Sequence, residues 1–544
     1  MSAVSRVQAA FARLREADRP EAWISLRAEP ETLTEAEAID CRVGDGEYLP
    51  LAGTVFAVKD NIDVTGLPTT AGCAAFAYSP SADAEAVARL RAAGAIVLGK
   101  TNMDQFATGL VGSRSPYGTV RNAWDPDRIS GGSSSGSAVT VALGIVDFAL
   151  GTDTAGSGRV PAALNGIVGL KPTRGLVPTG GVVPACRSLD CVTVFAPDLV
   201  LARRALAVLA PSARGPALPG TPRVAVPRPD QLTGLAAGWS EAFGAAVARM
   251  RSCGVDVVEA DVSPLLEAAT LLYDGAFVAE RYAAVGDFID KHPDADLDPT
   301  VAAVIRAGAT RTAAELFADR ERLNALAETG LRVFDSCDAL LTPTTTWHPT
   351  LAEVAADPVG ANSRMGRYTN FANLLDLAAV AVPAGFVEQL PFGVMLTGLA
   401  GHDGALAELA ARFAAPPVQI AVFGAHLRGQ PLNRQLVTLG GSLVEAVGTA
   451  PGYRLFALAT TPAKPGLVRV ASQGSAIPGE LWSLPAAGFA ELIATLPAPM
   501  TIGAVNLSDG RTVPGFLCEP AALESAVDIT TAGGWRAHLA GGTQ

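Results

Sequence analysis

Two loops rich in glycine and serine constrain this chain more than any other feature of its sequence. Residues 128–138 read Arg-Ile-Ser-Gly-Gly-Ser-Ser-Ser-Gly-Ser-Ala, and residues 151–157 read Gly-Thr-Asp-Thr-Ala-Gly-Ser. Because glycine leaves backbone N–H groups unhindered, each loop can present a hydroxyl beside backbone hydrogen-bond donors. Loops of this kind need regular elements on either side to hold them in place.

The sequence before the loops predicts such a framework. Residues 54–58 (Thr-Val-Phe-Ala-Val) form an apolar run typical of a buried strand, which ends beside Lys59. Residues 84–94 have helical spacing, and residues 96–99 (Ile-Val-Leu-Gly) predict a second short strand. This strand–helix–strand alternation predicts an α/β fold, a mixed sheet flanked by helices.

The same alternation continues through the two loops. A helix is expected over residues 137–143 and a strand over residues 146–150. The helix would cover about 10 Å and the strand about 16 Å, so the chain returns close to its starting edge. Both loops are therefore expected at one rim of the sheet, where α/β proteins usually bind ligands.

A change in texture predicts two domains. Residues 236–285 and 311–336 are predicted to be helical, and Pro416-Pro417 interrupts the pattern. From residue 420 onward, short strands alternate with Gly/Pro turns. We therefore expect a first domain over residues 1–415 and a small, mainly-β α+β domain over residues 420–544.

Charge and cysteine content exclude several classes of protein. The chain has 41 Lys and Arg against 53 Asp and Glu, a net charge of −12, which argues against nucleic acid or an anionic membrane as a partner. The seven cysteines form no CxxC pair, which indicates reduced thiols, a cytoplasmic location and no metal site. Residues 1–18 predict an amphipathic helix and not a signal peptide.

The serines need a base. A serine hydroxyl is a weak nucleophile unless a base lies within hydrogen-bond reach. The five histidines, at 292, 348, 402, 426 and 538, are all distant in sequence from the serine loops. Lys59 follows an apolar run, and burial lowers the pKa of a lysine, so it can serve as a neutral base. The alternative is a strand-end lysine paired with Asp60 or Asp63.

Each serine also has a structural alternative. The loop around Ser133 could cradle a phosphate, although it lacks the expected Gly-Lys-Ser/Thr ending. Ser157 follows three small residues (154–156) whose N–H groups can converge as an oxyanion hole. It could instead be the N-cap of a helix over residues 160–162.

Taken together, Lys59, Ser133 and Ser157, with Gly-Leu-Lys-Pro-Thr at 169–173, resemble the amidase signature family over roughly residues 1–415. That resemblance implies that Ser157 is the nucleophile and that Ser133, after a cis peptide, relays its proton to Lys59. It places the oxyanion hole on the backbone of Thr154, Ala155, Gly156 and Ser157, with support from Asp153 and Arg159.

Further segments, at 102–109, 113–118, 184–191 and 362–371, resemble the allophanate hydrolase subfamily. The resemblance places binding of this small anion on Arg281, Tyr273 and the backbone near Gly109. Eight residues on one helix turn through about 80° and rise about 12 Å, so Tyr273 and Arg281 could converge. The alternatives are core packing for Tyr273 and a salt bridge to Glu280 or Asp274 for Arg281.

Residues 422–433 and 477–482 resemble γ-glutamylcyclotransferase-like domains, which allophanate hydrolases carry at the C-terminus. The resemblance implies a second step there, decarboxylation of the N-carboxycarbamate that the first step releases. His426 is the expected polar actor and Glu480 a secondary one. Their alternatives are a turn cap and a strand-edge charge.

The expected activity is hydrolysis of allophanate to ammonia and N-carboxycarbamate, without a metal or organic cofactor. The alternatives are a general amidase for small amides such as biuret or malonamide, with a non-catalytic assembly domain, a transamidation subunit, and a catalytically silent scaffold. The resemblance suggests a homodimer. The allophanate would come from a urea carboxylase or from a triazine pathway, and the sequence leaves these two sources open.

Overall fold

The computed structural model describes residues 2–211 and 215–541. The chain divides into an N-terminal unit, Met1–Val247 with Val257–Ala414, and a C-terminal unit, Ala248–Asp256 with Ala415–Gln544.

The N-terminal unit is built on one mixed sheet of eleven strands, in the order β1-β3-β2-β4-β6-β5-β10-β11-β9-β7-β8. Strand β2 runs parallel to β3 and β4, whereas β4 with β6 and β10 with β11 are antiparallel. The mixed sheet predicted from the sequence is confirmed. The strands are β1 (Trp23–Leu26), β2 (Val55–Lys59), β3 (Ile96–Thr101), β4 (Phe148–Asp153), β5 (Val168–Lys171), β6 (Cys191–Ala196), β7 (Arg223–Pro227), β8 (Asp256–Ala260), β9 (Ala339–Pro343), β10 (Ala378–Val387) and β11 (Leu390–Gly398).

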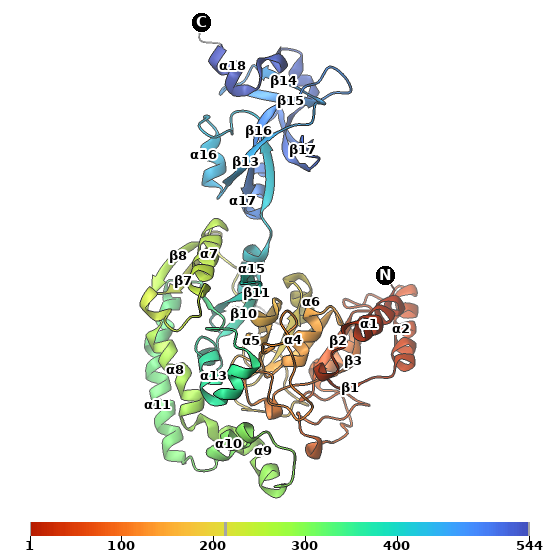
Figure 1. The fold of residues 1–544 in the computed structure, drawn as a ribbon, viewed down its shortest axis with the longest axis vertical. Helices are drawn as coiled ribbons and strands as arrows, with labels where there is room; N and C mark the ends of the chain where they lie inside the picture. Colours follow the sequence, from red (N-terminus) through yellow and green to blue (C-terminus); the bar gives the residue numbers. More distant parts are fainter. Residues whose placement is uncertain (1, 212–214, 542–544) are drawn as a thin grey trace. The chain divides into compact units, whose positions relative to one another are not determined.

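Helices flank this sheet (Figure 1). Contacts join α4 to β4, α5 to β11, α6 to β6 and α15 to β10. The helices of this part of the chain are α1 (Ala3–Ala17), α2 (Glu29–Gly44), α3 (Glu85–Ala92), α4 (Ser135–Ala142), α5 (Val160–Asn165), α6 (Leu199–Leu209), α7 (Trp239–Ser252), α8 (Ser263–Asp274), α9 (Ala279–Lys291), α10 (Pro299–Gly308), α11 (Ala313–Gly330), α12 (Leu351–Ala356), α13 (Pro358–Met365), α14 (Asn370–Leu374) and α15 (Asp403–Ala414).

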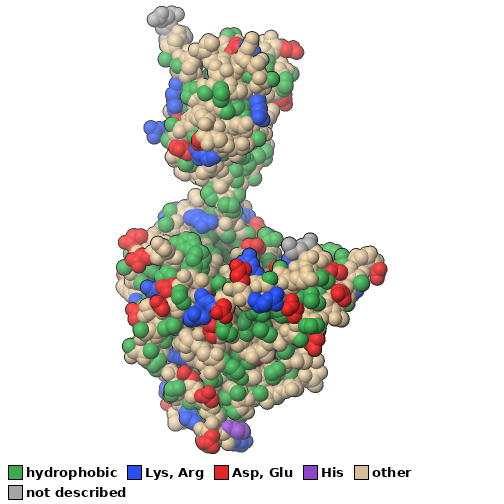
Figure 2. All heavy atoms as spheres, turned by 45° about the vertical axis from the view of Figure 1, so that its right-hand side comes forward, with side chains coloured by type: hydrophobic (Ala, Val, Ile, Leu, Met, Phe, Trp, Pro, Cys, Tyr) green, Lys and Arg blue, Asp and Glu red, His purple; other side chains and the backbone are tan. Residues whose placement is uncertain are grey.

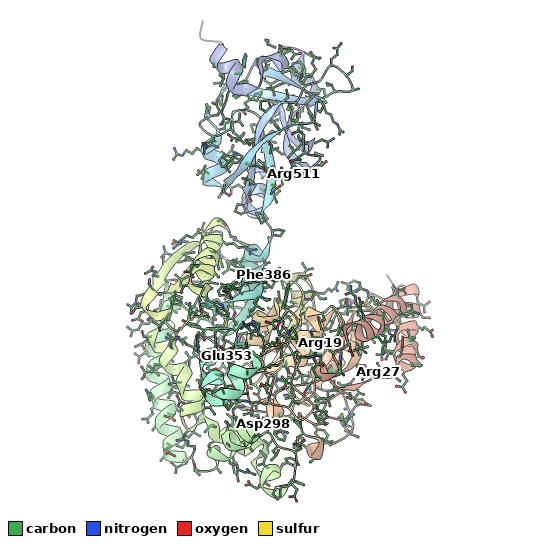
Figure 3. The ribbon with its side chains drawn as sticks, viewed as in Figure 1. Arg19, Arg27, Asp298, Glu353, Phe386 and Arg511 are labelled. Atoms are coloured by element: carbon green, nitrogen blue, oxygen red, sulfur yellow. The ribbon has the colours of Figure 1, made fainter. Side chains whose placement is uncertain are left out.

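Strands β2, β3 and β4 form the centre of the core around the serine loops. Every residue of each is buried, because helices cover both faces of a sheet of this kind. The rings of Phe56 and Phe148 stack with their centroids 5.0 Å apart. Side chains fill the space between sheet and helices. Figure 3 labels two acidic residues at helix starts: Asp298, the N-cap of α10, and Glu353, in the first turn of α12. Asp298 accepts a hydrogen bond from the Val301 N–H, and such caps fix where a helix begins.

The pairing of β2 with β4 sets the place of the loops. The two strands are parallel, and Val58 lies opposite Leu150. Their carboxyl ends therefore meet at one edge of the sheet, with Lys59 as the last residue of β2 and Asp153 as the last of β4. Ser133 lies just before α4, which begins at Ser135 and packs on β4.

Residues 236–285, predicted to be helical, are helical in most of their length but also contain a strand. The segment contains α7, the edge strand β8, α8, a short 3-10 turn at Ala276–Val278, and α9. Gly254, with φ of +76°, makes the turn between α7 and β8, a backbone conformation that glycine adopts without strain. Residues 311–336 are helical in most of their length, as α11 and the 3-10 helix Leu331–Asp335.

The C-terminal unit has a five-stranded sheet, β13-β16-β12-β18-β17, and a three-stranded sheet, β15-β14-β19. Its apolar core contains Ile420, Leu455, Trp482 and Phe516. The expected mainly-β α+β class is confirmed. The elements are β12 (Val418–Val422), α16 (Asn433–Thr438), β13 (Ser442–Gly448), β14 (Tyr453–Leu458), β15 (Lys464–Arg469), β16 (Pro478–Leu484), α17 (Ala486–Ala494), β17 (Met500–Asn506), β18 (Thr512–Cys518), β19 (Val527–Asp528) and α18 (Trp535–Gly541).

Surface charge is mixed. On the face shown in Figure 2, blue and red side chains are interspersed among tan and green ones. Within residues 2–211 and 215–541, no helix combines the length and the apolar character needed to cross a bilayer.

Candidate active site

Lys59 and Ser133 are in direct contact. The Lys59 Nζ lies 2.8 Å from the Ser133 Oγ and 2.8 Å from the Thr152 Oγ1. The Asn61 amide donates to the same Thr152 oxygen at 3.2 Å. All four side chains are buried, and the Gly132–Ser133 peptide is cis. The end of β2 and the start of α4 therefore bring the predicted base and the predicted relay serine together.

Burial makes Lys59 suited to act as a base. Desolvation lowers the pKa of its ammonium to about 7. The carboxyls of Asp104, Asp190 and Asp153 oppose this change without cancelling it. At neutral pH a large share of Lys59 is consequently the free amine, which can accept a proton.

Lys59 does not pair with Asp60 or Asp63. The Asp60 carboxylate lies 3.2 Å from Lys100 Nζ and also accepts from the Thr70 N–H at 2.9 Å. Asp63 accepts from the Tyr78 hydroxyl at 2.7 Å. The strand-end ion pair considered from the sequence is therefore absent among the described residues.

Ser157 lies at the same edge, and its hydroxyl faces a different partner from the one expected. The Ser157 Oγ donates to the Gly109 carbonyl at 3.4 Å. Within the described residues no hydrogen bond joins it to Ser133. It is not the N-cap of α5 either, since that position is taken by Arg159.

The loop 154–157 leaves backbone donors free. Within the described part of the chain, the N–H groups of Ala155, Gly156 and Ser157 donate to no acceptor. Gly156 has φ of +145°, and a Cβ there would lie 2.4 Å from the Thr369 Oγ1, so only glycine fits. Free N–H groups in a rigid loop beside a hydroxyl can stabilise an oxyanion. Thr154, the fourth residue of the expected oxyanion hole, is held in place by its hydroxyl, which donates to Asp190 at 2.5 Å.

A buried ion pair fixes this loop. The Arg159 guanidinium donates to both oxygens of Asp153 at 2.9 Å, and Asp153 also accepts from the Gly158 N–H at 2.9 Å. Burial alone would raise the pKa of Asp153, but the Arg159 charge holds it below its ordinary value. Arg159 further donates to the Asn373 side chain at 2.7 Å, which ties the loop to α14.

Two more buried carboxyls shape the site, and sequence reasoning gave neither a role. Asp104 accepts from the N–H groups of Val111, Gly112 and Arg114 at 3.0–3.2 Å and so orders the loop after Gly109. Asp190 accepts from the N–H groups of residues 185 and 186 as well as from the loop that carries Ser157. Burial raises the pKa of both carboxyls. Each lies inside a segment that resembles the subfamily, but that resemblance assigned neither carboxyl a role.

Tyr273 and Arg281 meet, although not on one helix as expected. Helix α8 ends at Asp274 and α9 begins at Ala279. A Cβ on Gly275 would lie 2.6 Å from the Leu271 carbonyl, so the chain turns where it has no side chain. The Arg281 Nη2 nevertheless donates to the Tyr273 hydroxyl at 3.2 Å.

The Arg281 guanidinium is buried without a carboxylate partner. Its Nη1 donates to the Thr108 hydroxyl at 3.1 Å and to the Ala107 carbonyl at 3.4 Å, and its Nε has no partner in the described structure. The alternative of a salt bridge to Glu280 or Asp274 is wrong within the described residues, since Glu280 accepts from Ser188 instead. A buried, unpaired guanidinium with a free donor favours an anionic ligand.

No histidine contacts the serines among the described residues. His348 contacts the first serine loop, where its Nε2 lies 2.9 Å from the Ile129 carbonyl oxygen. Burial lowers the pKa of His348 to about 4. Lys59 is therefore the base that the geometry offers.

The two candidates in the C-terminal unit lie in different surroundings. His426 lines a cavity and contacts Gln435 at 2.9 Å. Glu480 accepts from the Arg428 N–H, the Trp482 indole and the Arg536 guanidinium at 2.7–3.1 Å. Its carboxylate thus fastens three segments together, and it is not among the residues that line the cavity.

Comparisons with known proteins cover nearly the whole chain. Residues 6–407 match the family model "Amidase" and residues 418–540 match "Allophanate hydrolase C-terminal domain". The structure of selenomethionine-substituted allophanate hydrolase from Kluyveromyces lactis is similar with a TM-score of 0.70 and 38% identity, covering 99% of this chain and 97% of that one. The urea amidolyase of Saccharomyces cerevisiae is 42% identical over 570 residues, 95% of this chain and 31% of that protein, so the chain spans less than a third of this relative. The 2-amino-5-chloromuconic acid deaminase of Comamonas testosteroni is 34% identical over 69% of this chain and 83% of its own length.

Proposed function

We propose, since the chain belongs to the amidase family and carries the allophanate hydrolase C-terminal domain, that it hydrolyses allophanate. The family resemblance predicted from the serine loops is thereby confirmed. The observation that carries the proposal is the buried Lys59 amine, bonded to Ser133 and free of any carboxylate partner among the described residues.

The amide step uses three side chains in sequence. The Ser157 oxygen attacks the terminal amide carbonyl of allophanate, and its proton passes through Ser133 to Lys59. For this transfer the Ser157 hydroxyl must exchange the Gly109 carbonyl for Ser133, and catalytic hydrogen bonds often tighten only once substrate is bound. The proton then returns to the departing nitrogen, ammonia leaves, and water hydrolyses the acyl-enzyme.

Backbone groups support the negative charge that develops. The free N–H groups of Ala155, Gly156 and Ser157 point to an oxyanion hole, with Thr154 held in place by Asp190. Removing one donor from such a site typically costs about 10²–10³ in kcat. Because these donors are fixed by the Asp153–Arg159 pair, they need no reorganisation during the reaction.

The substrate's carboxylate fits Arg281. This guanidinium has an unused donor and no anionic partner in the described chain, and Tyr273 stands beside it. We assign the carboxylate to Arg281 and the backbone of Gly109 to the substrate's amide end. The product is N-carboxycarbamate, which we assign to the C-terminal domain for decarboxylation to ammonia and carbon dioxide.

A general amidase for small amides is the alternative, and substrate comparison separates the two. We expect ammonia release from allophanate with a kcat/KM well above that for biuret or malonamide, because only allophanate carries the anion that Arg281 is free to bind. Ser157→Ala should remove nearly all turnover, whereas Ser240→Ala, at an exposed position of α7, should not. Equal rates on the three substrates would favour the general amidase.

The similarity to urea amidolyase supports a partnership with a urea-carboxylating enzyme, which would supply allophanate. We also propose a homodimer, as the family resemblance suggests. A cytoplasmic location is supported by the seven free cysteines, none of which forms a disulfide among the described residues.

A further inference from the structure

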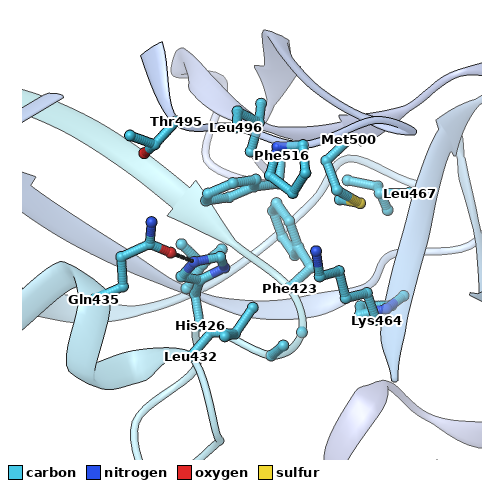
Figure 4. A pocket seen from close by; sticks show the side chains of 15 residues that line it. Phe423, His426, Leu432, Gln435, Lys464, Leu467, Thr495, Leu496, Met500 and Phe516 are labelled. Atoms are coloured by element: carbon cyan, nitrogen blue, oxygen red, sulfur yellow. Dashed lines mark hydrogen bonds between the residues drawn. The ribbon is translucent and has the colours of Figure 1, made fainter. Parts of the chain in front are cut away.

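A cavity of about 330 Å³ lies in the N-terminal unit. Part of its wall comes from α8 and part from residues 363–370, a segment whose arginines have no role in the amide step. The cavity of the C-terminal unit in Figure 4 has mainly apolar walls, whereas this one is lined by Arg364, Arg367 and Asp274. One water molecule needs only about 10–15 Å³ of such space, so the cavity is wide and does not fit closely around a small ligand.

Two residues of the wall connect this cavity to the candidate active site. Tyr273 lines it, and the Tyr273 hydroxyl accepts a hydrogen bond from the Arg281 Nη2 at 3.2 Å. Asn370 lines it as well. In the orientation that satisfies both ends of its amide, Asn370 donates to the Ala155 carbonyl at 2.8 Å, in the loop that carries Ser157. The cavity therefore borders both the group assigned to the substrate's carboxylate and the loop of the nucleophile.

Arg367 brings a positive charge to this wall that no carboxylate neutralises. Among the described residues it forms no ion pair, and its buried Nε has no hydrogen-bond partner. Its guanidinium lies 5.1–6 Å from aromatic carbon, 5.7 Å from the centroid of the Tyr368 ring, and the Tyr368 hydroxyl is itself bonded to the Gln231 carbonyl at 3.0 Å. An unpaired charge fixed at the wall of a wide cavity raises the local concentration of ions of opposite sign.

We propose that this cavity is the entrance to the active site and that Arg367 determines specificity there, by attracting amides that carry a carboxylate towards Arg281. The inference rests on the proposed function, since it takes the substrate to be a small anionic amide. Arg367 touches no reacting atom, so its contribution lies in kcat/KM and leaves kcat unchanged. Asp274 lines the same cavity with a negative charge and acts on the same substrates with the opposite sign.

Malonamate and malonamide test this specificity, because they are alike in size and differ only in a carboxylate that replaces one amide. We expect Arg367→Gln to lower kcat/KM for malonamate about fivefold, with kcat unchanged, and to alter malonamide by less than about twofold. Arg367→Lys keeps the charge and should recover most of the loss. Asp274→Asn should raise kcat/KM for malonamate. Arg320→Gln, the same change of charge at an exposed position of α11 outside the cavity wall, is the control and should alter neither substrate.

Equal losses on malonamate and malonamide in Arg367→Gln would show a purely structural role and refute the proposal, and so would a lower kcat/KM for malonamate in Asp274→Asn. Ammonia release from malonamate but not from allophanate, with the effect of Arg367 retained, would overturn the proposed function and leave the entrance standing. If neither amide is hydrolysed, calorimetric titration with malonate decides. Weaker binding in Arg367→Gln, at the site that Arg281→Gln abolishes, supports the entrance, and unchanged binding refutes it.

Discussion

Replacing Arg281 with glutamine should separate anionic from neutral substrates. The guanidinium is buried and has no carboxylate partner within the described residues, so a bound substrate carboxylate would be its first counter-ion. At about 4 Å and an effective dielectric constant of about 20, such a pair is worth about 4 kcal/mol. Since about 1.4 kcal/mol corresponds to a tenfold change, kcat/KM for allophanate should fall by about 10³.

A neutral amide loses much less in the same variant. Biuret would lose only a neutral hydrogen bond, about 1 kcal/mol, or roughly fivefold in kcat/KM. The assay is ammonia release from both substrates by the wild type, Arg281→Gln and Arg281→Lys. The lysine variant keeps the charge but not the planar fork, so it should recover part of the loss on allophanate. Equal losses on allophanate and biuret would refute the assignment of Arg281 to the carboxylate.

Two further predictions concern Lys59 and its neighbour. Thr152→Val removes the oxygen that accepts a hydrogen bond from Lys59, so kcat should fall about tenfold or more with KM little changed. The acid limb of the pH profile should move to lower pH, because the ammonium form of Lys59 loses a hydrogen bond. Thr140→Val, at a buried position of α4, is the control, and an unshifted acid limb in Thr152→Val would contradict the role of Thr152. Lys59→Met should be inactive and, at pH 7, more stable than the wild type by about 4 kcal/mol. The pKa of Lys59 is 10.5 in the unfolded chain and about 7 in the folded one. Between these values the unfolded chain binds more protons, so the free energy of unfolding of the wild type rises with pH. Urea unfolding of both proteins from pH 7 to 10 should show this gap closing, and parallel curves would contradict it.

Sequence patterns were sufficient to place Lys59 and Ser133. Apolar runs predicted β2 and β4, and parallel pairing brought the ends of these strands to one edge. Periodicity missed the strand inside residues 236–285, because β8 is an edge strand and its neighbour in the sheet, β7, lies outside this segment. The break at Gly275 has the same cause, since the neighbouring Ala276 N–H is held by Asp319 of α11 at 2.6 Å.

The roles of Asp104 and Asp190 were out of reach for a related reason. Each accepts hydrogen bonds from backbone groups in its own loop, and their influence on Lys59 is electrostatic, through the folded interior. The spacing of residues along the sequence gives no indication of this electrostatic effect on Lys59. The direction of the Ser157 hydroxyl was equally hidden, because its partner Gly109 comes from a different loop.

The pH dependence of kcat/KM for ammonia release tests the role of Lys59 most directly. Only the neutral amine accepts a proton, and the Lys59 pKa is about 7, so the rate should rise with pH through neutrality. We predict a rate about tenfold higher at pH 8 than at pH 6, with a plateau above pH 8. A rate that stays constant from pH 5.5 to pH 8.5 would contradict proton transfer to this lysine.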